Sequence, residues 1–238
     1  MFLFGVHPIL IAAAVIPAVV LLLCVRRADR LEAESPRVLI SLVIGGIIAT
    51  ALALIGERIG TFLIGLFFEE NTVAYAAALF FLVVGPAEEG FKYLLLKRRT
   101  WNEPEFNCQF DGVVYAVFVS LGFALWENIS YVAMYGFGTA LVRAVTASPG
   151  HACFGVFMGA WYGLAKRCEL NGEPKRSKVC RILSVCCAAL LHGVYDFAAS
   201  VEIAGCSWFF AVFVAALFFV SWLTIRRLSR KDRYIRPY

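Results

Sequence analysis

The segment that decides the fold runs from Phe80 to Leu96 and reads FFLVVGPAEEGFKYLLL. It belongs to a longer apolar run, residues 72–96, that can cross a bilayer as a helix. Two adjacent carboxylates, Glu88 and Glu89, and one lysine, Lys92, interrupt it. A charge at the centre of a membrane helix costs at least about 2.5–3.5 kcal/mol, so such residues indicate a functional site. The alternative is a buried ion pair that only joins two helices.

The composition is that of a polytopic membrane protein. The chain has 238 residues, of which 61% are hydrophobic and 16% charged, whereas soluble domains have about 25% charged residues. The formal net charge of +5 does not indicate nucleic-acid binding, because the basic residues flank the apolar runs. The eight cysteines form no CxxC pair, so neither a disulfide framework nor a thiolate zinc site is predicted.

We expect an all-α fold with seven transmembrane helices in one integral-membrane domain, 1–238, whose catalytic core covers about 72–199. The expected spans are residues 2–25, 38–55, 72–96, 112–135, 141–165, 182–199 and 206–225. Residues 56–71 are predicted to form a loop, because their apolar middle is too short to span the bilayer. Pro149 and Gly150 predict a break within the fifth span, just before His151.

The distribution of basic residues predicts the orientation. Nineteen of the 22 lysines and arginines lie in alternate connectors and in the C-terminal tail, at 26–37, 97–111, 166–181 and from 226 onward. Positively charged connectors stay in the cytosol. We therefore expect the N-terminus outside and the C-terminus in the cytosol.

Four of the expected spans each bring an acid or a histidine to the middle of the bilayer. At about 1.5 Å per residue, these side chains lie about 12–22 Å from one end of their spans. Asp196 follows His192 by one helical turn, so the two share a face. Lys92 follows Glu88 by the same spacing and is expected to pair with a carboxylate. The set predicted to form the active site is Glu88, Glu89, Glu127, His151, His192 and Asp196.

These residue types favour metal-assisted hydrolysis. Neutral imidazoles and carboxylates are zinc ligands, and an adjacent acid can serve as general base. We predict one zinc ion held by His151 and His192 with one or two acids. The candidate acidic ligands are Glu88, Glu89, Glu127 and Asp196. A metal-free mechanism with a glutamate-activated water, a proton-coupled transporter and a non-catalytic scaffold protein remain alternatives.

Four sequence blocks in order carry a family resemblance. They are Glu88-Glu89-Gly-Phe-Lys92, Phe123-Ala-Leu-Trp-Glu127, His151-Ala-Cys-Phe-Gly155 and His192-Gly-Val-Tyr-Asp196. With these blocks the chain resembles the PrsW family of bacterial intramembrane proteases, which is related to the CAAX-protease and bacteriocin-processing superfamily. The resemblance spans roughly residues 86–197.

The resemblance implies a multi-pass endopeptidase of the bacterial plasma membrane. Its substrate would be a single-span, membrane-anchored anti-sigma factor, cut near the outer face as the first step of an envelope-stress or antimicrobial-peptide response. The residues carried over by position are the same six, Glu88, Glu89, Glu127, His151, His192 and Asp196. Lys92 is expected to support the site without contacting substrate.

Overall fold

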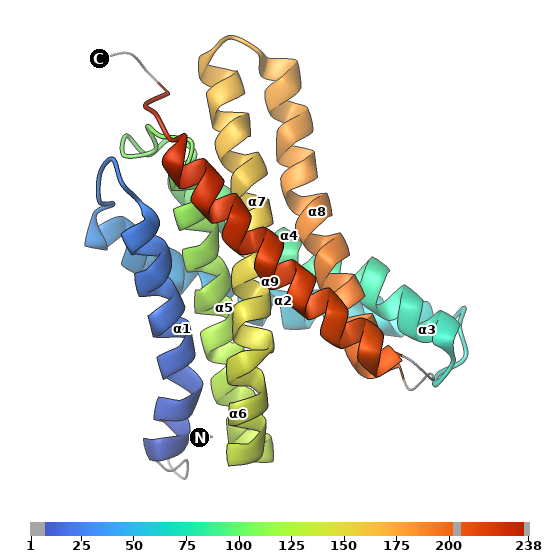
Figure 1. The fold of residues 1–238 in the computed structure, drawn as a ribbon. Helices are drawn as coiled ribbons and strands as arrows, with labels where there is room; N and C mark the ends of the chain where they lie inside the picture. The colour runs from blue at the N-terminus through green and yellow to red at the C-terminus, as the bar shows by residue number, and fades with distance from the viewer. Residues whose placement is uncertain (1–7, 202–205, 236–238) are drawn as a thin grey trace.

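The computed structural model describes residues 8–201 and 206–235 and is all-helical, which confirms the predicted fold class (Figure 1). Residues 2–7 of the first expected span lie outside the described residues. The elements in chain order are α1 (Pro8–Ala28), α2 (Pro36–Gly65), α3 (Val73–Ala78), the π-helix η1 (Leu79–Val84), α4 (Gly85–Thr100), α5 (Asp111–Tyr135), α6 (Phe137–Val145), α7 (Ala147–Leu170), α8 (Pro174–Ser200) and α9 (Cys206–Arg230).

Within the described residues, six helices are long and apolar enough to cross a membrane. They are α1, α2, the continuous helix Val73–Thr100, α5, α8, and α9 from Trp208. The fifth expected span is instead divided into α6 and α7. α7 is 24 residues long, but glycines and the basic residues near its end reduce its apolar character. Much of α7 is buried within the protein.

The core of the molecule is built around α5, which is buried over most of its length and packs against α1, α2 and α7. The approach to α7 depends on glycine. A Cβ atom on Gly159 would lie 2.4 Å from the Val113 Cα, and one on Gly112 would lie 2.5 Å from the Gly163 nitrogen. Small residues let helix backbones come this close, which is how helices associate in membranes without a hydrophobic driving force.

The predicted loop at residues 56–71 is wrong for residues 56–65, because α2 continues to Gly65. Within this part of the helix, Gly60 allows close packing. A Cβ atom on Gly60 would lie 2.4 Å from Cγ1 of Val83 in η1. The extended α2 therefore lies against η1 and α4.

The predicted interruption before His151 is present, but it falls at Thr146, between α6 and α7. Pro149 lies in the first turn of α7. The N–H groups of a first helical turn have no partner within the helix, so proline is tolerated at this position.

The helix that carries the two glutamates changes its geometry just before them. In η1 the Gly85 N–H bonds the carbonyl of Phe80, five residues back. Pro86 follows directly and has no N–H to contribute to the regular α-helical ladder. Such π-helical turns often occur at functional sites, and this one sets the direction in which Glu88 and Glu89 leave the helix.

Candidate active site

The adjacent charges of α4 form a buried cluster. Glu89 and Lys92 are both 0% exposed, and Glu88 is 6% exposed. The Lys92 ammonium lies 3.2 Å from Oε2 of Glu88 and 2.7 Å from Oε1 of Glu89. It also lies 3.9 Å from the centre of the Phe123 ring of α5. The pairing expected for Lys92 from its spacing is therefore present.

His192 of α8 connects this cluster to Asp196. Its Nδ1 atom is 2.9 Å from Oε1 of Glu89, and its Nε2 atom is 3.3 Å from Oδ2 of Asp196. The imidazole stacks on the Phe154 ring of α7 with centroids 4.8 Å apart. Its orientation is thus fixed by contacts at both nitrogens and on one face.

His151 of α7 lies on the other side of Lys92. Its Nδ1 atom is 3.1 Å from the Lys92 ammonium, and its Nε2 atom is 2.9 Å from Oε2 of Glu127. Because an ammonium group can only donate, Nδ1 is assigned as the acceptor, and Nε2–H then donates to Glu127. The His151 and His192 rings are 5.2 Å apart between centroids.

Arg143 of α6 is a site residue that the sequence analysis did not include. Its Nη2 atom forms an ion pair of 2.9 Å with Oε2 of Glu127. Its Nε–H donates to Oδ1 of Asn128 over 2.8 Å, and its guanidinium lies 4.0 Å from the centre of the Tyr131 ring. Its charge within the expected span 141–165 is the sequence signal that could have identified it.

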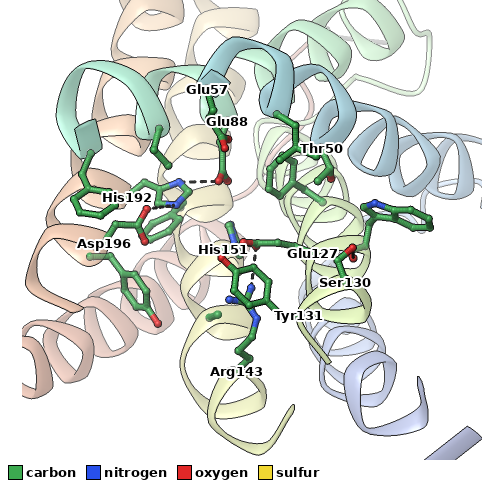
Figure 2. Close-up of a pocket in the computed structure, with 18 of the residues that line it drawn as sticks. Thr50, Glu57, Glu88, Glu127, Ser130, Tyr131, Arg143, His151, His192 and Asp196 are labelled. Carbon is green, nitrogen blue, oxygen red and sulfur yellow. Dashed lines mark hydrogen bonds and ion pairs between the residues drawn. The ribbon is translucent and has the colours of Figure 1, made fainter. Parts of the chain in front are cut away.

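All these elements surround one cavity of about 470 Å³, shown in Figure 2. The ionisable residues that line it are Glu57, Glu88, Glu127, Tyr131, Tyr135, Arg143, His151, His192, Tyr195 and Asp196. Neither Glu89 nor Lys92 is among the lining residues. Glu57 was missed because its segment was predicted to be a loop.

The donor set suits a metal ion. One ligand atom from each of Glu88, Glu89, His151 and His192 lies within 4.8 Å of the others. Oε2 of Glu89 is buried and has no hydrogen-bond partner among the described residues. Two imidazoles and two carboxylates are the nitrogen and oxygen ligands that zinc accepts. A metal on these atoms would take over contacts that Lys92 now makes.

The other two predicted ligands, Glu127 and Asp196, are not in that group of four. Each instead contacts one of the histidines, Glu127 at His151 and Asp196 at His192. Carboxylates that bond the second nitrogen of a metal-binding histidine fix its orientation and tautomer. The geometry therefore suits an orienting role for both residues.

Apolar membrane-crossing helices that enclose a cavity lined by carboxylates and imidazoles define a polytopic membrane protein with an intramembrane polar site. The sequence comparison gives the particular class. The model of a family described as "PrsW family intramembrane metalloprotease" matches residues 34–223. The chain belongs to this family and is a multi-pass intramembrane protease. Membership decides against the transporter and scaffold alternatives.

Several bacterial relatives carry the name Protease PrsW. The one from Geobacillus kaustophilus (strain HTA426) is 31% identical over 96% of this chain and 94% of its own length. The one from Halalkalibacterium halodurans is 33% identical over 66% of this chain and 69% of its own length. The one from Bacillus subtilis (strain 168) is 37% identical over 54% of this chain and 57% of its own length. No solved structure shows significant similarity to this chain.

Proposed function

We propose that this protease cuts a single-span membrane protein of the anti-sigma-factor type, as the first cleavage of an envelope-stress or antimicrobial-peptide response. The observation that carries the proteolytic part is the cavity inside the helical membrane bundle, which is lined by Glu88, Glu127 and both histidines. The substrate class rests on the family resemblance of the sequence blocks around these residues.

Glu88 is the residue we assign to water activation. Of the adjacent glutamates it alone lines the cavity, so it alone can reach a water molecule and a peptide bond there. Glu89 lies behind it, where it holds the Lys92 ammonium and Nδ1 of His192. Its role is to hold Lys92 and to act as a ligand of the metal. A carboxylate that accepts the proton of an attacking water contributes about 10²–10⁴-fold to a rate.

The proposed metal is zinc, bound by His151, His192 and Glu89. A bound zinc ion lowers the pKa of its water to about 7 and polarises the carbonyl group under attack. The residues of this chain set the geometry: Glu127 and Asp196 orient the two imidazoles, and Arg143 holds Glu127.

The test is cleavage of single-span substrates by the purified protein in detergent, with and without a chelator. Anti-sigma-type proteins are compared with an unrelated single-span protein of equal length, and mass spectrometry locates the cut. We expect cleavage of the former at a site near the outer membrane face. Equal cleavage of both classes would contradict the substrate assignment and leave the protease assignment intact.

Elemental analysis of the same preparations tests the zinc assignment. We expect close to one zinc ion per chain in the wild type and strongly reduced zinc in His151→Ala and His192→Ala. Full activity in protein shown to be metal-free would contradict it.

A further inference from the structure

A second cluster of acids lies far from the active site. It is found where the α1–α2 connector, the loop before α5 and the C-terminal tail meet at one end of the bundle (Figure 1). Asp111 begins α5, sixteen residues before Glu127, a separation of about 24 Å along a helix. The acids gathered here are Asp29, Glu32, Glu34, Glu105, Asp111 and Asp232.

Three of these acids point at one another. One carboxylate oxygen from each of Asp29, Glu34 and Asp111 lies within 4.8 Å of the other two. Glu34 is 3% exposed and Asp111 is 0% exposed, so water cannot solvate their charges. None of the three takes part in an ion pair with a described lysine, arginine or histidine.

The hydrogen bonds of the two buried acids use only one oxygen each. Oδ2 of Asp111 accepts from the backbone N–H groups of Asn107 and Cys108, at 3.0 and 2.7 Å. Oε2 of Glu34 accepts from the Tyr115 hydroxyl. Oδ1 of Asp111 and Oε1 of Glu34 are buried without a partner among the described residues. Buried oxygens of this kind are costly unless something binds them.

We propose that Asp29, Glu34 and Asp111 bind a hard divalent cation, Mg²⁺ or Ca²⁺, at this end of the bundle. Carboxylate oxygens are the ligands that both ions prefer, with water completing the coordination shell. A soft metal is disfavoured, because all three candidate ligands are carboxylate oxygens. The cation would tie the α1–α2 connector to the start of α5.

The alternative to a cation is shared protons. Burial raises the pKa of Glu34 to about 8, with nearby Asp29, Glu105 and Glu32 adding to the shift. Burial, followed by Asp232 and Glu32, raises the pKa of Asp29 to about 6. A divalent cation neutralises the same charges without protons, so added metal stabilises the fold only if the cluster binds it.

The experiment measures thermal unfolding of the purified full-length protein in detergent after chelator treatment. MgCl₂ and CaCl₂ are titrated separately, with KCl at equal ionic strength as the control. We expect one or both divalent ions to raise the unfolding midpoint saturably by about 5–10 °C at concentrations far above Kd. KCl is expected to have no saturable effect.

Glu34→Gln is the diagnostic variant, and Glu105→Gln is its matched control. Both replace one carboxyl group with an amide at the same end of the molecule, but Glu105 already accepts the Ser35 N–H and is not in the group of three. The cation-dependent shift should disappear in Glu34→Gln and persist in Glu105→Gln. Because the active site is intact in both variants, a difference between them cannot arise from metal bound there.

Binding of Mn²⁺ as a paramagnetic substitute, followed by electron paramagnetic resonance, gives a readout that does not depend on stability. We expect Glu34→Gln to bind one ion fewer than the wild type and Glu105→Gln. If Glu34→Gln does not fold, Asp29→Asn, at the half-buried acid of the three, replaces it in both measurements. Absence of a saturable shift with both ions in the wild type, or an equal shift in Glu34→Gln, overturns the proposal.

Discussion

At the scale of single residues, Glu88 and Glu89 differ in what they can reach. Glu88 lines the cavity, whereas Glu89 is fully buried between Lys92 and His192. We therefore expect Glu88→Gln to reduce turnover by about 10²-fold or more while folding is kept. Glu89→Gln should also lower the unfolding temperature, because removing one partner of a buried pair costs about 3–5 kcal/mol.

Rates of reporter cleavage at equal protein level, with unfolding midpoints from the same preparations, check this difference. A Glu88→Gln variant that cleaves at the wild-type rate would remove Glu88 from the mechanism. If Glu89→Gln unfolds at the wild-type temperature, its assigned role in holding Lys92 is wrong.

Arg143 gives a second prediction at this scale. Its guanidinium bridges Glu127 and Asn128, and Glu127 in turn holds His151. We expect Arg143→Met to reduce activity by about 10–100-fold, the usual effect of losing a group that orients a metal-binding residue. The activity of Arg143→Lys should lie between those of the wild type and Arg143→Met, because a lysine keeps the charge but cannot bond both partners in the same planar geometry.

The readout that separates positioning from general stability is the zinc content. Arg143→Met should bind zinc more weakly in competition with a chelator, while its unfolding midpoint in zinc-saturated protein stays near that of the wild type. A loss of stability with unchanged zinc affinity would instead indicate a purely structural role for Arg143.

At the scale of helices, the site depends on the close approach of α4 to α8. A Cβ atom on Gly85 would lie 2.6 Å from the carbonyl oxygen of Ala189, which is backbone and cannot rotate away. Gly85→Ala must therefore push the two helices apart and lengthen the 2.9 Å contact between Glu89 and His192. We expect a loss of activity of about 10-fold or more from such a displacement.

Gly90→Ala is the matched control in the same helix. A Cβ atom there meets nothing within 4 Å outside the local helix, and alanine favours a helix by about 1 kcal/mol over glycine. This variant should keep its activity and unfold at the same or a higher temperature. Equal activity in the two variants would show that the α4–α8 distance does not control the site.

At the scale of the whole molecule, the prediction concerns orientation. The basic connectors and the C-terminal tail indicate a cytosolic C-terminus. In the structure the connector 29–35, the loop 101–110 and the turn 171–173 lie at the same end of the bundle as the tail, as this orientation requires (Figure 1). A C-terminal fusion to green fluorescent protein should fluoresce, and one to alkaline phosphatase should be inactive. The opposite pattern would reverse the orientation.

The sequence by itself determined the fold class and most of the site. Long apolar runs indicate membrane helices because the bilayer requires every backbone group to be satisfied within the segment. The cost of burying charge in such runs then singled out Glu88, Glu89, Glu127, His151, His192 and Asp196. These are properties of single segments and need no knowledge of their neighbours.

Only the tertiary structure showed which of these residues line the cavity and which contact one another. It separated the cavity-lining Glu88 from Glu89, and it joined Arg143 to Glu127. It also placed Glu57, on the continued helix α2, in the cavity wall. Each of these facts depends on which helices touch and how closely. The close approach at glycines such as Gly60 and Gly85 sets the distance between the helices. The hydropathy of the sequence does not predict this distance.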